Sequence, residues 1–337
     1  MAATIHDVAQ LAGVAISTVS KVMNDSPRIS EQTRARVREA MRQLDYHPSR
    51  HARGLARNRS DSIGVLMGLG RHHAFHNPYR FEILSGIEQS CTQQQHSVTL
   101  LNTQWLAQDR KAVSQLVAER KVDAVILHAD EQAPFFIRQF TQLKLPFVVI
   151  GRGAPGEGHS WVDMDNRHAG LLATRHLLAQ GYRRLQFIGN HPADGISLQR
   201  EQGFTQALAE AGLAPQTPAL FAQAGEVAEG AALWQQIVQQ PQRPDALLVA
   251  GNPLAAGLLA AARSQGIAIG PELGLVSFDN YPYAQLTDPP LSVLDIDLFA
   301  LGQRAAHEVF LQLANPGHRS QIMLLDMALQ ARASSRR

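Results

Sequence analysis

The sequence predicts a small all-α domain at the N-terminus, followed by an α/β core with two doubly wound parallel-sheet subdomains. Three observations support this prediction. Short amphipathic helical patterns fill the first 47 residues, apolar runs of strand length alternate with helical patterns from Ser62 onward, and the alternation starts again near Trp161. Strands that alternate with helices form parallel sheets whose two faces are covered by those helices.

Length and composition are those of a globular protein with several folded units. The chain has 337 residues, 45% of them hydrophobic, and its single cysteine, Cys91, excludes an internal disulfide framework. No apolar run approaches the ~18 residues of a membrane span. The N-terminus also lacks the basic and apolar segments of a signal peptide. We therefore expect a cytoplasmic protein with no membrane partner.

The net charge is distributed unevenly. Residues 1–60 contain ten Lys and Arg against five Asp and Glu, a net charge of +5, whereas the whole chain carries +2 and the remainder therefore −3. A basic segment joined to a mildly acidic body is typical of a protein that binds nucleic-acid phosphates. A solvated basic surface explains the same charge equally well.

The N-terminal segment is predicted to form three short helices. Thr4 caps the first, with Asp7 as its reciprocal partner, and Gly13 ends it. The second spans about residues 16–24, and the third begins at Ser30. Their apolar stripes predict one small shared core, formed by Val8, Leu11 and Ala12, by Val19, Val22 and Met23, and by Val37, Ala40, Met41 and Leu44.

The second helix presents a small, polar and cationic outward face. It consists of Ile16, Ser17, Ser20, Lys21 and Asn24. Lys21 can donate to guanine O6 and N7, Ser17 can pair with several base edges, and Ile16 can contact a thymine methyl group. Two helices joined by a glycine turn and followed by a packing helix form a helix-turn-helix arrangement, which places such a face in the major groove of DNA. The alternative is an ordinary surface helix that exposes one isoleucine and does not bind DNA.

Residues 4–24 (TIHDVAQLAGVAISTVSKVMN) resemble the headpiece of the lactose-repressor/galactose-repressor (LacI/GalR) family. Residues 29–37 (ISEQTRARV) and 44–48 (LDYHP) continue the match. The resemblance implies a sequence-specific DNA-binding transcription regulator in which Ile16, Ser17 and Lys21 contact bases. Contacts with the DNA backbone are expected from Thr4, Thr18, Asn24 and Arg50.

Residues 48–61 are expected to form a hinge helix and linker. A ten-residue segment with an internal Gly54 is too short for a self-stable helix, so we expect it to become ordered only on DNA. The family resemblance implies that Leu55 wedges into the minor groove, with Arg53 and Arg57 beside it. A flexible basic linker is the alternative.

The core alternates predicted strands with predicted helices. The strands are Ile63–Met67, Val98–Leu101, Ala124–Leu127, Phe147–Ile150, Leu185–Ile188, Ala246–Val249 and Gly274–Phe278. The helices include Tyr79–Gln94, Arg110–Glu119, Asn166–Gln180, Leu198–Ala211 and Pro253–Gln265.

The family resemblance continues through the core, at residues 86–88 (GIE), 162–166 (VDMDN), 200–204 (REQGF) and 277–280 (SFDN). It implies a periplasmic-binding-protein-like fold with a cleft between two subdomains, and chain crossings near residues 161, 291 and 324. The expected domains are a headpiece at 1–47, the hinge and linker at 48–61, an N-subdomain at 62–161 plus 292–324, and a C-subdomain at 162–291 plus 325–337.

Arg200 and Asp279 match effector-contacting positions of the family. A carboxylate that accepts from hydroxyl groups and a guanidinium that donates to ring oxygens suit a polyol, and ligands of parallel sheets bind beyond the carboxyl ends of the strands. Further candidate effector contacts are Tyr79, Arg152, Trp161 and Asn252. For each aromatic residue, a place in the core is the alternative.

Four positions depart from the family pattern. Ala15 stands where the family usually has serine, and Lys21 stands where arginine is more frequent, so one base preference is expected to differ. Gly251 and Asn252 stand where the family often has asparagine and aspartate. The polar lining of the effector site is therefore altered, and no particular sugar is implied.

Motifs of other function classes are absent from the sequence. The third glycine of a dinucleotide fingerprint would fall at His73, and neither a Walker lysine pattern nor a nucleophile elbow occurs. His72, His73 and His76 share one predicted loop with His128 or Asp130 as possible partners, but they lack the spacing of a metal site. We expect no enzyme activity, no cofactor and no metal.

The sequence thus predicts a homodimeric repressor that binds a palindromic operator in double-stranded DNA. A sugar effector in the core would release it and so control a carbohydrate-utilisation operon. Co-repression by a purine, control by a partner protein and an enzymatic core are the alternatives.

Overall fold

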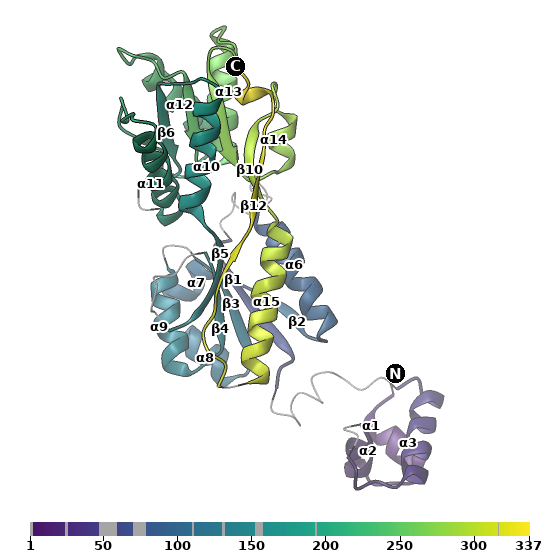
Figure 1. Ribbon diagram of the computed structural model, residues 1–337. Helices are drawn as coiled ribbons and strands as arrows, with labels where there is room; N and C mark the ends of the chain where they lie inside the picture. Colours follow the sequence, from purple (N-terminus) through teal and green to yellow (C-terminus); the bar gives the residue numbers. More distant parts are fainter. Residues whose placement is uncertain are drawn as a thin grey trace.

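The computed structural model describes residues 3–23, 26–46, 59–69, 79–109, 111–129, 132–151, 158–192, 194–315 and 317–337. It confirms the predicted fold class: a helical N-terminal domain precedes an α/β core with two mostly parallel sheets (Figure 1). Within these ranges, no helix is both long enough and apolar enough to span a bilayer.

The N-terminal domain consists of α1 (Ile5–Ala12), α2 (Ile16–Met23) and α3 (Glu31–Gln43). The predicted reciprocal cap of α1 is present, because the Thr4 hydroxyl accepts from the Asp7 amide while the Asp7 carboxylate accepts from the Thr4 amide at 2.8 Å. Gly13 ends α1 in the left-handed conformation, at φ 62°.

The small core of this domain differs from the predicted stripes in one residue. Val8, Val19, Val22 and Val37 are buried together as expected. Leu11, however, is 50% exposed, and Ala9 takes its place on the buried face of α1 beside Val8 and Ala12.

The first core sheet, sheet A, has the strand order β11-β5-β4-β3-β1-β2, and all its neighbouring strands are parallel. Its strands are β1 (Ser62–Met67), β2 (Ser97–Asn102), β3 (Ala124–His128), β4 (Phe147–Ile150), β5 (Ser160–Met164) and β11 (Ile322–Leu325). Its helices are α6 (Tyr79–Gln93), α7 (Thr103–Gln108), α8 (Ala112–Ala118), α9 (Ala133–Leu143) and α15 (Leu298–Ala314).

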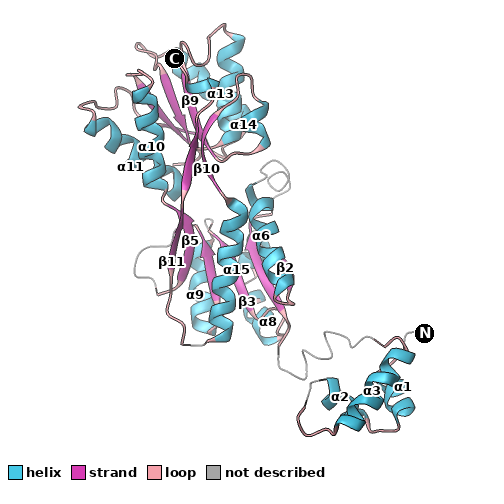
Figure 2. Cartoon of the chain, turned by 45° about the vertical axis from the view of Figure 1, so that its right-hand side comes forward, coloured by secondary structure: helices cyan, strands magenta, loops and turns pink. Residues whose placement is uncertain are grey.

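Helices cover both faces of sheet A (Figure 2). Ile63, Val65 and Ile126 point toward α6 and α15, whereas the alternating residues Leu66 and Val125 point toward α8 and α9. This alternation is what a strand buried on both faces requires, because successive side chains leave a strand on opposite sides.

The second core sheet, sheet B, has the strand order β12-β10-β9-β8-β6-β7, and only the β10–β12 pair is antiparallel. Its strands are β6 (Leu185–Gly189), β7 (Leu220–Phe221), β8 (Ala246–Val249), β9 (Gly274–Phe278), β10 (Ser292–Ile296) and β12 (Met327–Gln330). Its helices are α10 (Asn166–Ala179), α11 (Gly195–Glu210), α12 (Val227–Val238), α13 (Asn252–Ser264) and α14 (Pro282–Leu286), and the short helix η1 (Ala333–Ser335) follows β12.

The chain passes between the two sheets three times: after β5, after β10 and after β11. The first two crossings lie a few residues beyond the expected positions near residues 161 and 291. The reason is that β5 stays paired with β11 as far as Met164, and β10 stays paired with β12 as far as Ile296. These pairings are tertiary contacts between distant segments, which local sequence patterns do not contain.

Glycines allow three helix pairs of the core to pack backbone against backbone. A methyl group built at Gly170 of α10 would lie 2.0 Å from the carbonyl oxygen of Arg200 in α11, and one at Gly203 would lie 1.9 Å from that of Arg167. The same reciprocal arrangement joins α6 to α15 and α12 to α13. A side chain at any of these glycines would force the helices apart.

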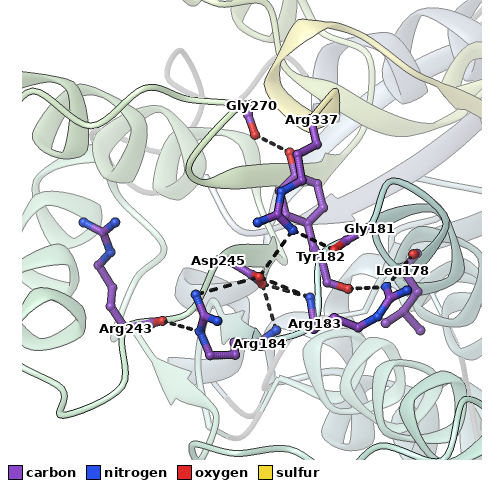
Figure 3. A network of polar contacts seen from close by, with 9 residues as sticks. All are labelled: Leu178, Gly181, Tyr182, Arg183, Arg184, Arg243, Asp245, Gly270 and Arg337. Atoms are coloured by element: carbon purple, nitrogen blue, oxygen red, sulfur yellow. Dashed lines mark hydrogen bonds and ion pairs between the residues drawn. The ribbon is translucent and has the colours of Figure 1, made fainter.

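The buried carboxylate of Asp245 anchors the C-terminal residues to sheet B (Figure 3). Its oxygens accept from the amides of Arg183 at 3.1 Å and Arg184 at 2.8 Å. The guanidinium of Arg337 lies 3.7 Å from the carboxylate and donates to the carbonyl of Gly181 at 2.6 Å. One side chain thus joins the turn before β6, the start of β8 and the last residue of the chain.

Replacement of Asp245 by alanine is expected to lower the free energy of unfolding by about 2 kcal/mol, because the part-buried amides of Arg183 and Arg184 lose their acceptor. Urea unfolding followed by circular dichroism measures the change. The control is Glu119→Gln, which breaks only an exposed ion pair with Lys121 and should cost less than about 1 kcal/mol. Equal effects of the two substitutions would contradict the anchoring role of Asp245.

Candidate functional site

The outward face of α2 is accessible, as DNA contact requires. Ile16 is 37% exposed, and Ser17 and Lys21 are also exposed, while Val19 and Val22 fix the opposite side of the helix in the core. The exposed part of this apolar side chain is free to contact a partner. The three predicted base-contacting residues therefore share one accessible face.

The residues predicted to contact the DNA backbone differ in their exposure. Thr18 is half-buried, and its amide donates to the carbonyl of Ala15 at 2.8 Å, which stabilises the first turn of α2. Thr4 is exposed, but its hydroxyl donates to the Asp7 carboxylate at 2.8 Å and so serves the α1 cap. The predicted DNA contacts Asn24, Arg50, Arg53, Leu55 and Arg57, and the predicted effector contact Arg152, lie outside the described residues.

A second group of polar residues lies where the two sheets face each other, at the carboxyl ends of their strands. We call it the intersheet site; it comprises Tyr79, His128, Asn166, Asn190, Arg200, Asn252, Asp279 and Tyr281. Arg200, on α11, is its buried cation. Its Nε donates to Asn166 Oδ1 at 2.9 Å and one Nη to the Ala250 carbonyl at 2.7 Å.

The guanidinium of Arg200 also lies over an aromatic ring. Its central carbon is 3.8 Å from the ring centroid of Phe278, the last residue of β9, and its second Nη lies 3.6 Å from the sulfur of Met164. This stacking holds the guanidinium plane in one orientation. Arg200 is thereby fixed next to Asp279, the residue that follows Phe278.

Asp279 lies at the end of β9 in the left-handed conformation, at φ 67°. Its amide donates to the Leu294 carbonyl at 2.8 Å, and its own carbonyl accepts from Asn252 Nδ2 at 2.7 Å. Burial, together with the charge of Asp295, raises the pKa of the Asp279 carboxyl to about 6, although the positive charge of Arg200 opposes the shift. Such a raised pKa marks a carboxylate that lacks enough partners to offset its desolvation.

Four buried oxygens of the intersheet site have no hydrogen-bond partner among the described residues. They are Oδ1 of Asn190, Oδ1 of Asn252, Oδ1 of Asp279 and the hydroxyl of Tyr281. Buried polar atoms are nearly always paired, and an unpaired one costs about 1–3 kcal/mol. A cluster of four at adjacent strand ends indicates a place where a polar ligand supplies the missing partners.

Aromatic residues connect the two sheets across this site. The ring of Tyr79, on α6, lies edge-on to His128 at 5.6 Å and to Tyr281 at 6.5 Å between centroids. Burial and the charge of Arg80 lower the pKa of His128 to about 4, and burial raises the pKa of Tyr79 and of Tyr281. All three rings are therefore neutral near pH 7.

The structure brings four of the predicted effector residues together in this site: Arg200, Asp279, Tyr79 and Asn252. Trp161 lies elsewhere, because it is the second residue of β5, at the strand end remote from the site, and it is buried in the apolar cluster with Phe136 and Phe140. Asn190 was not predicted. Its one sequence signal is a polar residue directly after a buried strand.

One group of described residues has the composition of a metal site. Asp61, His96 and Asp123 each offer a ligand atom within 4.8 Å of the others. The carboxylate oxygens of Asp123 already accept from the amides of Ser60 and Asp61, at 2.8 Å each. These bonds join the start of β1 to β3 and hold Asp61 beside Asp123 without a metal.

Replacement of Asp279 by asparagine should stabilise the ligand-free chain above pH 6 by on the order of 1–3 kcal/mol. The folded-state pKa of about 6 exceeds the ordinary value of 3.8, so the native state loses stability as pH rises between these values. Asparagine also tolerates the left-handed backbone. Thermal unfolding from pH 4 to 8 measures the difference, which should vanish near pH 4. Exposed Asp326→Asn is the control, and a pH-independent difference would contradict the assignment.

Two families match the chain. Residues 4–49 match the family described as "Bacterial regulatory proteins, lacI family", and residues 174–335 match the "Periplasmic binding protein-like domain". The first match covers α1 to α3, and the second covers every strand of sheet B together with α15 and β11.

Two curated relatives span nearly the whole chain. The "HTH-type transcriptional repressor PurR" of Actinobacillus pleuropneumoniae serotype 3 is 30% identical over 304 residues, which are 90% of this chain and 89% of that protein. The "HTH-type transcriptional regulator GalR" of Escherichia coli K12 is 29% identical over 314 residues, which are 93% and 90% of the two chains. Both are named as regulators of transcription.

The fold is also that of a solved regulator. The Lac repressor dimer bound to operator and the anti-inducer ONPF superposes with a TM-score of 0.83 at 24% identity, over 99% of each chain. The accessible face of α2, the two-sheet core and the relatives of similar length agree with one another. The chain is a DNA-binding transcriptional regulator of the LacI family.

Proposed function

We propose that the protein is a homodimeric repressor of a carbohydrate-utilisation operon, released from a palindromic operator when a sugar binds the intersheet site. In this proposal residues 1–47 form the DNA-binding headpiece and residues 48–61 the hinge and linker. The part of the chain from residue 62 onward senses the effector.

The unpaired oxygens of the intersheet site are the observation that favours a sugar as the effector. Asn190, Asn252 and Asp279 each present an acceptor that lacks a donor within the described part of the chain. The hydroxyl groups of a sugar supply several donors along one edge, and the neutral rings of Tyr79 and Tyr281 suit the apolar face of a pyranose. Arg200 retains N–H groups that can donate to ring or hydroxyl oxygens.

Control of DNA binding follows from the position of this site between the sheets. Side chains from both sheets line it, so a ligand that contacts both favours one relative placement of the sheets. Two copies related by a two-fold axis present their α2 helices to two half-sites of the operator. The spacing of the half-sites has to match the distance between the two helices. By linkage, operator DNA weakens sugar binding by the same factor by which the sugar weakens operator binding.

Co-repression by a purine is the second candidate function. The PurR relatives at 30% identity favour it, and the aromatic rings of Tyr79 and Tyr281 also suit the face of a purine. The two candidates differ in sign, because a co-repressor raises operator affinity whereas an inducer lowers it.

Substitution Lys21→Ala should weaken binding to the selected operator by roughly 5- to 150-fold, because one base contact is worth about 1–3 kcal/mol. It should also relax base preference at one position in each half-site. In vitro selection of DNA by the full chain, followed by fluorescence anisotropy, measures both effects. Lys111→Ala, on the exposed surface of the core, is the control and should change neither. A uniform loss of affinity for every DNA sequence would contradict base contact by Lys21.

A thermal-shift screen of the full chain tests the effector. The probes are neutral mono- and disaccharides, sugar phosphates and the purine bases hypoxanthine and guanine. A ligand that binds the native state raises its melting temperature by mass action. The proposal expects a neutral sugar to raise the melting temperature and to lower operator affinity. A response to purines alone, with operator affinity increased, would replace induction by co-repression.

A further inference from the structure

Three of the unpaired acceptors lie at the ends of three neighbouring strands. The order β9-β8-β6 within sheet B places Asp279, Asn252 and Asn190 side by side at its carboxyl edge. Asn252 is oriented by its Nδ2 bond to the Asp279 carbonyl at 2.7 Å, which leaves its Oδ1 as the free atom. The three side chains thus present a row of acceptor oxygens.

Asn190 reaches this row through space left by two glycines. A methyl group built at Gly251 would lie 2.6 Å from Asn190 Oδ1 and 3.2 Å from its Nδ2, and one at Gly225 would lie 3.0 Å from Oδ1. The amide of Asn190 therefore occupies the volume that a side chain at residue 251 would fill. Any larger residue there would displace it.

The backbone does not explain the glycine at position 251. Gly251 has φ −149° and ψ 146°, an extended conformation open to any residue. What excludes a side chain at this position is the amide of Asn190. Gly251 and Asn190 therefore act as a pair, in which the absence of one side chain makes room for another.

The chemistry of the row restricts the ligand. Amide and carboxylate oxygens accept hydrogen bonds, so the ligand edge that faces them must carry donors. A phosphate group offers only acceptors when fully ionised, and a purine edge alternates donors with acceptors. Consecutive hydroxyl groups of an unphosphorylated polyol offer donors in succession.

We propose that Asn190 is a specificity-determining residue of the effector site, admitted by Gly251, and that with Asn252 and Asp279 it selects an unphosphorylated polyol. This inference rests on the proposed function and names the ligand class of the same site. The choice of ligand then depends on the contact between Asn190 and Gly251, two residues that are distant in the sequence.

The test measures binding of glucose, galactose, cellobiose, glucose 6-phosphate and hypoxanthine to the full chain by isothermal titration calorimetry. At least one neutral sugar should bind the unmodified chain. Asn190→Ala should weaken that binding about tenfold, the effect of one lost hydrogen bond. Asn190→Asp, which keeps acceptor oxygens at the same place, should retain it within about threefold.

A double-mutant cycle separates the pair from a general effect on packing. Gly251→Ala should weaken sugar binding by itself but add little in the Asn190→Ala background, because the side chain that it displaces is already gone. Gly195→Ala is the matched control, since a methyl group there meets no atom within 4 Å. It should leave sugar binding unchanged.

Four results would overturn the inference: sugar binding unaffected by Asn190→Ala, additive effects of the two substitutions, binding of glucose 6-phosphate or hypoxanthine alone, or binding of no probe. Circular dichroism of each variant verifies that it is folded. If Asn190→Ala does not fold, Gly251→Ala still decides the matter, because it should weaken sugar binding by displacing the Asn190 amide. Selection of operator DNA by the unmodified chain, without any probe, reports on the proposed function alone. A failure of the proposed function is therefore distinguishable from a failure of the inference about Asn190.

Discussion

The close approach of α10 and α11 determines the geometry of the intersheet site. Gly170 and Gly203 let the two helix backbones touch, and the atom that Gly170 accommodates is the carbonyl oxygen of Arg200 itself. From this position Arg200 contacts Asn166, Ala250 and the Phe278 ring. Its charge then acts on Asp279, one residue further along. A larger residue at either glycine would move the buried cation away from the carboxylate that it faces, and the site would lose its electrostatic balance.

The sequence predicted those parts of the fold that rest on local patterns. The strands β3, β4, β8 and β9 are short apolar runs and lie within one residue of their predicted bounds. The strands β5, β10, β11 and β12 were missed, because polar or exposed residues interrupt them and each is stabilised by pairing with a segment distant in the sequence. The resemblance pointed to Arg200 and Asp279, and the fold brings both into the intersheet site. The proposed role of Asn190 depends on Gly225 and Gly251, which only the folded chain brings next to it.

The intersheet site stores an electrostatic cost that a ligand can release. An ionised Asp279 with a raised pKa and four oxygens without donors all destabilise the empty site at neutral pH. The surrounding helices and the Asp245 anchor supply stability elsewhere in sheet B. In the proposed function, a ligand that provides the missing donors offsets this cost, and the free energy so released biases the relative placement of the two sheets and with it DNA binding.

The late position of α15, β11 and β12 in the chain has a consequence for synthesis on the ribosome. Sheet A lacks the cover of α15 until residue 314 has been translated, and sheet B lacks its antiparallel edge until residue 330. The helices α1 to α3 have their whole core by residue 46 and can fold as soon as they leave the exit tunnel. Premature termination would therefore release a folded headpiece joined to an open, aggregation-prone core.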